Sequence, residues 1–99
     1  MAVKDIRKRY IAFRLKNGET DRKRMINAIR EAFTKNEYRV IEPWLTVFTG
    51  KKGIIRVSHL GKKRAIEVLN RTVVNDCKVE TITTSGTIKN AKERLFKDE

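Results

Sequence analysis

The chain has 99 residues, 39% of them hydrophobic, and its 24 lysines and arginines against 12 aspartates and glutamates give a net charge of +12. This length predicts one small domain spanning residues 1–99. The longest apolar run, Tyr10-Ile11-Ala12-Phe13, is far shorter than the roughly 18 residues of a membrane span. We therefore expect no membrane segment. With no signal-peptide pattern and a lone cysteine, Cys77, we also expect a reducing, cytoplasmic location.

The excess of positive charge runs through the whole chain. Residues 1–50 and residues 51–99 each contain 12 basic and 6 acidic side chains, so the charge does not come from a detachable tail. Lysine and arginine side chains that neutralise phosphates release condensed counterions, which favours binding. A nucleic acid is therefore the expected partner, with an anionic membrane surface or an acidic protein as the alternatives.

The first half of the chain predicts a strand, a helix and a hairpin. Residues 10–15 alternate between apolar and polar side chains, which predicts a strand with Ile11, Phe13 and Leu15 on one face. A helix is predicted from Thr20, as N-cap, to about Lys35. After Pro43, residues 44–48 and 54–57 are rich in aromatic and β-branched side chains and predict a hairpin.

The second half predicts a helix, a strand and a short terminal helix. Gly61 precedes a helical pattern that ends at Asn75-Asp76, residues 77–84 alternate as a strand does, and Thr87 is a plausible N-cap for a helix ending near Phe96. The order of elements predicts a ferredoxin-like βαββαβ fold. This is a two-layer α+β sandwich with a four-stranded antiparallel sheet, and a C-terminal helix is added to it.

The predicted sheet has too many apolar side chains for one face. If one face meets the helices, with Val47 among its residues, the other receives Tyr10, Trp44, Phe48 and Ile54. An apolar patch of this size is rarely left exposed on a monomer. Two alternatives remain open: the terminal helix folds back over the patch, or a partner protein binds there, which makes these four residues the candidate protein interface.

The same face invites comparison with the base-stacking platform of RNA recognition motifs, which carry aromatic residues on the two central strands. The first strand offers Tyr10, but the third offers only Ile54, Arg56 and Ser58. The sequence therefore does not predict base readout on single-stranded RNA.

We find no constellation of residues that predicts catalysis. His59 and Cys77 stand alone and cannot assemble a zinc site, and the acidic residues are scattered rather than convergent. An enzyme on this scaffold is therefore the weakest of our functional hypotheses, and we expect no cofactor or metal bound by this chain.

Basic residues gather in four clusters along the chain, and we predict that together they contact RNA phosphates. The clusters lie before the first strand, in the hairpin, at the start of the second helix and on the last helix. Their members are Arg7, Lys8, Arg9, Lys51, Lys52, Lys62, Lys63, Arg64, Lys89, Lys92 and Arg94.

Three segments carry a family resemblance. Residues 9–13 (RYIAF), 53–57 (GIIRV) and 84–89 (TSGTIK), with Pro43-Trp44-Leu45 between them, resemble the archaeal-type ribonuclease P protein component 2 family. This family has relatives in eukaryotic ribonuclease P and in the related mitochondrial-RNA-processing enzyme. The resemblance extends from Arg9 to Phe96 and is most specific at residues 85–89.

The resemblance implies an accessory subunit of a ribonucleoprotein. In this family an RNA subunit with magnesium carries the chemistry and removes the 5′ leader from precursor tRNA. The resemblance also implies pairing with ribonuclease P protein component 3 and a dimer of such pairs. The alternative function is that of a stand-alone ribosome- or RNA-associated binding protein.

Overall fold

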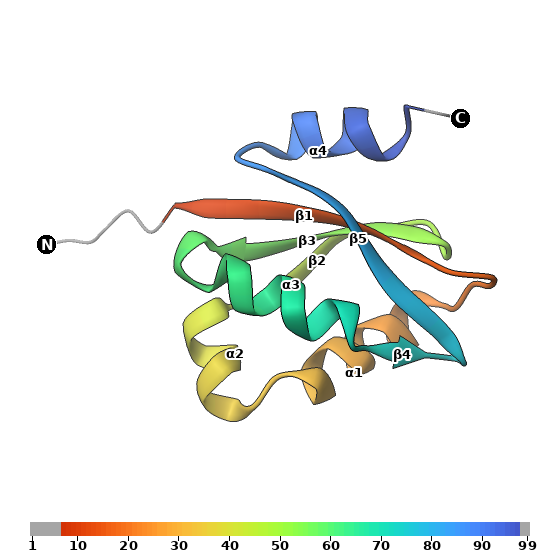
Figure 1. The fold of residues 1–99 in the computed structure, drawn as a ribbon, viewed down its shortest axis with the longest axis horizontal. Helices are drawn as coiled ribbons and strands as arrows, with labels where there is room; N and C mark the ends of the chain where they lie inside the picture. The colour runs from red at the N-terminus through yellow and green to blue at the C-terminus, as the bar shows by residue number, and fades with distance from the viewer. Residues whose placement is uncertain (1–6, 98–99) are drawn as a thin grey trace, which may run out of the picture.

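The computed structural model describes residues 7–97, shown in Figure 1. Its strands are β1 (Lys8–Leu15), β2 (Trp44–Phe48), β3 (Lys52–Ser58), β4 (Val73–Val74) and β5 (Cys77–Ser85). Its helices are α1 (Arg22–Ala32), α2 (Lys35–Ile41), α3 (Lys62–Asn70) and α4 (Ile88–Leu95), and a 3-10 turn, η1 (His59–Gly61), precedes α3.

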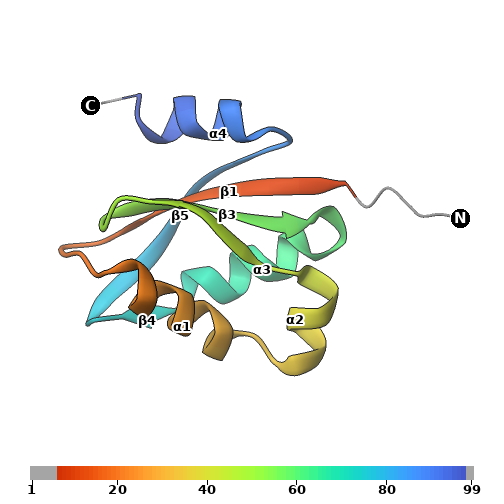
Figure 2. The ribbon, with the colours of Figure 1, turned by 180° about the vertical axis from the view of Figure 1, so that it is seen from behind.

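The strands form one sheet in the order β2-β3-β1-β5-β4, and every neighbouring pair is antiparallel. The sheet curves into a half-barrel. Helices α1, α2 and α3 lie on one face, which we call the helix face. Helix α4 lies on the opposite face, as Figures 1 and 2 show from two sides.

The predicted four-stranded ferredoxin-like sandwich is wrong. The described residues form a five-stranded half-barrel sheet with four helices, and these helices lie on both faces rather than one. The fifth strand, β4, pairs only Val73 with Lys78 and Val74 with Cys77. Two residues are too few to produce an alternating pattern, so the sequence gives no signal for this strand.

Helix α2 is the second element that the prediction lacks. Thr34 caps it: its side chain accepts a hydrogen bond from the Glu37 backbone N–H (3.1 Å), and the Glu37 carboxylate accepts one from the Thr34 N–H (3.0 Å). This reciprocal pair is a capping box, which satisfies two N–H groups that a helix start otherwise leaves without partners. The helix ends at Ile41, and the next residue, Glu42, adopts the left-handed conformation (φ 52°) directly before Pro43.

The larger core lies between the sheet and the helix face. Phe13 is fully buried there and stacks on Phe48 with a ring-centroid distance of 6.3 Å. Gly53 makes this packing possible, because a Cβ atom there would lie 2.7 Å from Phe13 Cζ and 2.8 Å from the Val47 carbonyl oxygen. The other large side chains that are fully buried in this core are Ile11, Met25, Ile41, Ile55, Leu69, Val57 and Val79.

An irregularity in β2 reverses two predicted orientations. Leu45 pairs with Ile55, but the register then shifts and Val47 pairs with Ile54. A bulge of this kind moves every later side chain to the other face of the sheet. Val47 therefore packs against the α4 side and Phe48 against the helix face, the opposite of the predicted assignment.

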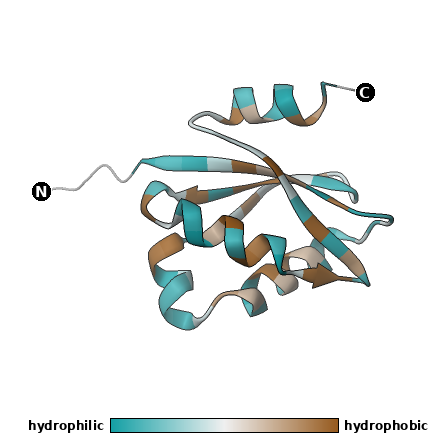
Figure 3. Ribbon diagram, viewed as in Figure 1, coloured by the Kyte–Doolittle hydropathy of each residue, from teal (hydrophilic) through white to brown (hydrophobic). Residues whose placement is uncertain are grey.

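Helix α4 covers the middle of the second sheet face. Ala12 and Ile54, which pair across β1 and β3, are fully buried there against Ala91 and Leu95 of α4. Of the two alternatives for this face, folding back of the terminal helix is the one that the structure shows for these residues. Figure 3 shows hydrophobic residues in the middle of the strands and hydrophilic residues at the start of β1 and in the β2–β3 turn.

Candidate nucleic-acid interface

The fold brings two of the four predicted basic clusters together. The His59 N–H donates a 2.8 Å hydrogen bond to the Arg7 carbonyl oxygen, and α3 begins three residues later at Lys62. The starts of β1, α3 and α4 lie at the same end of the molecule in Figures 1 and 2. The Arg9 guanidinium lies 3.5 Å from where a Cβ atom of Gly86 would stand, just before α4. We call this end, with residues 7–9, 62–64 and Lys89, the first basic end.

A second group of cations lies at the opposite end. The β2–β3 turn and the C-terminal end of α4 are both there (Figures 1 and 2). They carry Lys51 and Arg94, both exposed, and Arg94 borders an open pocket of about 330 Å³ together with Arg14 and Lys52. The predicted phosphate-contacting residues therefore form two ends rather than one continuous surface.

Four of the predicted residues are already engaged within the chain, and one of them is Arg9, whose Nη1 donates to the Lys8 carbonyl oxygen (3.2 Å). Lys8 Nζ lies 3.1 Å from Glu42 Oε1, and Arg64 makes ion pairs with both Glu37 and Glu67. Lys52 Nζ donates to the Leu95 carbonyl oxygen (3.2 Å) and lies 5.7 Å from the centre of the Phe96 ring. Lys52 thus contacts the last turn of α4, where a cation also meets the negative end of the helix dipole.

Two carboxylates contact Arg64 at the surface. Hydrogen bonds from the Thr34 backbone and from Arg64 lower the pKa of Glu37, and the hydrogen bonds to Glu37 and Glu67 raise the pKa of Arg64. Arg64 consequently offers less charge to a polyanion than its neighbours do. Within residues 7–97 the predicted residues that make no ion pair are Arg7, Arg9, Lys51, Lys62, Lys63, Lys89, Lys92 and Arg94.

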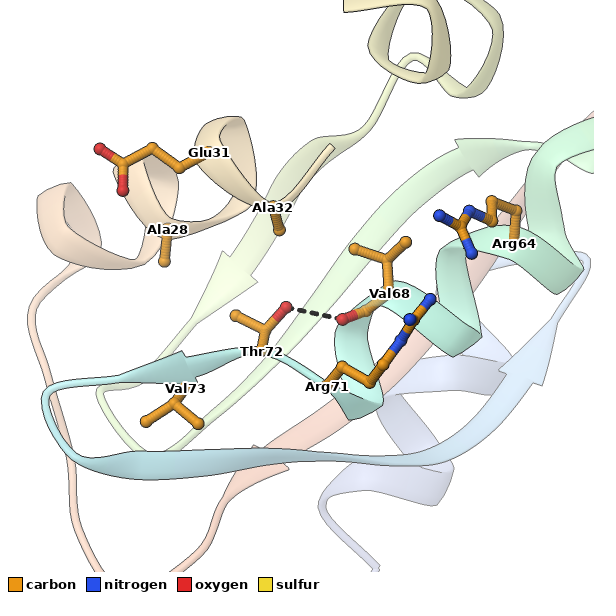
Figure 4. Close-up of a pocket in the computed structure, with 8 residues that line it drawn as sticks. All are labelled: Ala28, Glu31, Ala32, Arg64, Val68, Arg71, Thr72 and Val73. Carbon is orange, nitrogen blue, oxygen red and sulfur yellow. Dashed lines mark hydrogen bonds between the residues drawn. The ribbon is translucent and has the colours of Figure 1, made fainter. Parts of the chain in front are cut away.

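An open pocket of about 420 Å³ lies between α1 and α3, and Arg64 of the first basic end borders it (Figure 4). Arg64 and Arg71 lie on its α3 side and Glu31 on its α1 side. Ala28, Ala32 and Val68 also line it, while the Thr72 hydroxyl donates to the Val68 carbonyl oxygen (2.7 Å). Arg71 was not among the predicted residues. Its spacing of seven from Arg64, two helical turns, is the signal that could have found it.

The four residues of the predicted protein interface do not form one surface. Ile54 is fully buried under α4, and Phe48 packs against the helix face. Tyr10 is half-buried beside the α4 cluster, whereas Trp44 is 60% exposed. Tyr10 therefore lies on the α4 face, and Trp44 stands at the edge of the sheet, where it also borders a small pocket with Arg22 and Tyr38.

Two further features bear on the classes of function. Among residues 7–97, no three histidine, cysteine, aspartate or glutamate side chains are grouped so as to hold a metal ion. In the same part of the chain, no helix combines the length and hydrophobicity that a membrane-spanning segment needs.

Comparison with known proteins gives one clear similarity. No protein-family model matches the chain. The ribonuclease P protein component 2 of Methanococcus aeolicus is 31% identical to it over 100 aligned positions, which cover 92% of this chain and 73% of that protein. The similarity therefore extends over most of both chains.

Proposed function

The chain belongs to the ribonuclease P protein component 2 family, and from this premise we propose that it acts as an accessory subunit of ribonuclease P. In this proposal the RNA subunit, with magnesium, cleaves precursor tRNA to release its mature 5′ end in the cytoplasm. The protein binds that RNA, neutralises part of its charge and so favours the active RNA fold. The observation that carries the proposal is the similarity over 92% of the chain.

The charge distribution supports the RNA-binding part of this proposal. The chain carries +12 overall. Exposed cations that make no ion pair within residues 7–97 lie at both ends, Lys63 and Lys89 at the first and Lys51 at the second. Two separate cationic ends suit an elongated, folded polyanion that contacts the protein at more than one place. Since each neutralised phosphate releases counterions, several such contacts together give substantial affinity at low salt.

We propose further that ribonuclease P protein component 3 binds this chain, and that two such pairs associate. In support, four aliphatic side chains are largely exposed within residues 7–97: Val40, Leu60, Val73 and Ile82. Aliphatic groups gain little from contact with nucleic acid, whereas burial against a protein removes them from water. A protein partner that binds over them would bury this apolar surface, in addition to any contact with RNA.

The test is reconstitution of precursor-tRNA cleavage with the cognate RNA subunit, with and without this chain and component 3. We expect the chain to raise the cleavage rate at limiting magnesium and to have no nuclease activity when the RNA is omitted. RNA binding without any effect on cleavage would instead support the stand-alone RNA-binding protein. Cleavage by rigorously RNA-free protein would show that the chain is an enzyme.

A further inference from the structure

Three side chains stand in one row across the sheet. Trp44 of β2 pairs with Arg56 of β3, and Arg56 pairs in turn with Tyr10 of β1. Residues directly opposite each other in antiparallel strands point to the same face, with Cβ atoms roughly 5 Å apart. The register therefore aligns an indole, a guanidinium and a phenol side by side. We call Tyr10, Arg56 and Trp44 the aromatic row.

The aromatic row lies beside α4 rather than beneath it. Ala12 and Ile54 follow the row by two positions along β1 and precede it by two along β3, and α4 buries both of them. In the row itself Trp44 is 60% exposed, and Tyr10 and Arg56 are half-buried. Trp44 belongs to β2, the strand at the edge of the sheet. The row is thus the part of this face that α4 leaves open to a ligand.

Arg56 has an unused hydrogen-bond donor. Within residues 7–97 its Nε atom is buried and has no hydrogen-bond partner. A ligand cannot reach the buried Nε, so it would accept from the terminal Nη groups of the guanidinium, which are not among the buried atoms. Glu42, the acidic residue nearest to Trp44 in the sequence, forms an ion pair with Lys8 (3.1 Å) and is not the acceptor for Arg56.

The chemistry of the aromatic row matches an unpaired nucleotide. Aromatic rings and arginine guanidinium planes stack on the faces of bases, and arginine also donates to phosphate or base oxygens. An exposed tryptophan beside an unpaired arginine donor offers both interactions within one row. The positive net charge of the chain, +12, favours a polyanionic ligand over a protein surface that carries few acidic residues.

We propose that the aromatic row binds unpaired RNA nucleotides, with a base stacked on Trp44 and an oxygen of the same strand accepting from Arg56. This inference rests on the proposed function, and it adds a site that reads single-stranded rather than helical RNA. The sequence does not predict this site, because its first and third strands lack paired aromatics. The second aromatic comes instead from the edge strand, through the register of β2.

Trp44 is the single tryptophan of the chain, so its fluorescence reports on this site alone. The full-length protein is titrated with a ten-nucleotide oligoadenylate RNA, with a ten-base-pair RNA duplex and with inorganic polyphosphate of similar charge. We expect the single strand to quench the fluorescence in a saturable way. Polyphosphate and the duplex, whose bases are not free to stack, should bind without comparable quenching.

Variants then separate stacking from charge. Because the Trp44 variants contain no tryptophan, their affinities are measured by fluorescence anisotropy of a dye-labelled oligoadenylate. One stacked base is worth a factor of about ten in affinity, so Trp44→Ala should weaken binding about tenfold without changing its salt dependence. Trp44→Phe should keep the affinity within about threefold, since a ring remains. Leu60→Ala removes a side chain that is even more exposed, 72%, and lies outside the row, so it should bind as the wild type does. Thermal unfolding of each variant verifies that the fold is retained.

Two results would overturn the stacking site. One is an unchanged oligoadenylate affinity in Trp44→Ala, and the other is equal quenching by polyphosphate. If Trp44→Ala weakens binding to component 3 but not to oligoadenylate, the row is a protein contact and the proposal is wrong. Failure here is distinguishable from failure of the proposed function, because stimulation of precursor-tRNA cleavage by the wild-type chain is measured separately.

Discussion

Lys52 Nζ donates a hydrogen bond of 3.2 Å to the carbonyl oxygen of Leu95, which joins the first residue of β3 to the last of α4. The sequence alone places Lys52 with the phosphate-contacting residues, because it stands beside Lys51 in a polar turn. In the structure the two neighbours differ. Lys51 is exposed, whereas half-buried Lys52 contacts the C-terminal turn of α4.

We predict that Lys52→Met loosens α4 and that Lys51→Met does not. Loss of a charge-assisted hydrogen bond at a helix C-terminus should lower the free energy of unfolding by about 1 kcal/mol. Amide hydrogen exchange of Ala91 and Leu95, measured by NMR, should accelerate in Lys52→Met. Equal effects of the two variants on exchange and stability would mean that the Lys52 contact does not hold the helix.

The capping box of α2 gives a second prediction. Thr34→Ala removes the acceptor for the Glu37 N–H and should lower the free energy of unfolding by about 1 kcal/mol, whereas Thr34→Ser keeps the hydroxyl and should cost much less. Urea denaturation of both variants measures the difference. If the alanine and serine variants are equally stable, the hydroxyl does not stabilise α2.

This helix also shows where prediction from the sequence failed. The sequence predicts that a helix ends at Lys35-Asn36, but Thr34 and Glu37 have the spacing of a capping box and in the structure begin one. The strands β1 and β5 were predicted in position from their alternation, and the β2–β3 hairpin from its aromatic and β-branched residues. β4, with two residues, was not, and the predicted fold class was consequently wrong.

The candidate interface was predictable in composition but not in arrangement. The basic clusters are visible as runs of lysine and arginine, yet the hydrogen bond between His59 and Arg7 that brings two of them together is a product of the tertiary fold. The pairing of Arg64 with Glu37 likewise joins residues 27 positions apart. Nothing local in the sequence marks the register shift in β2 that turns Phe48 towards the helix face.

The low pKa of Glu37 predicts how stability depends on acid. Its folded-state pKa lies below the ordinary value of 4.5, because the Thr34 backbone and Arg64 donate hydrogen bonds to the charged carboxylate. A group of this kind contributes stability above its unfolded pKa and loses it as the pH falls through the folded pKa. We therefore expect the free energy of unfolding to change little between about pH 5 and 7 and to fall below about pH 4.5.

The matched pair for this test is Glu37→Gln and Glu93→Gln. The first removes the titrating group of the Arg64 ion pair, and the second removes an exposed carboxylate of α4 that makes no ion pair within residues 7–97. Urea denaturation across this pH range should show a shallower acid loss in Glu37→Gln than in Glu93→Gln. Identical acid profiles would mean that the ion pair of Glu37 with Arg64 does not contribute to the loss of stability in acid.

Charge reversal at the first basic end gives the last prediction. Lys62 and Lys63 make no ion pair within residues 7–97, so Lys62→Glu with Lys63→Glu should remove two phosphate contacts without unfolding the domain. Binding to the ribonuclease P RNA should weaken at low salt. The slope of log affinity against log salt should become shallower by about 0.7 for each lost contact to unpaired RNA.

Lys23→Glu on α1, which lies outside both basic ends, is the control and should change the slope less. Arg64 is left unchanged, because a third carboxylate beside Glu37 and Glu67 would destabilise the helix pair and confuse loss of charge with loss of fold. An unchanged slope in the double variant would show that phosphates do not contact this end, and RNA binding would then depend on the cations of the β2–β3 turn and α4.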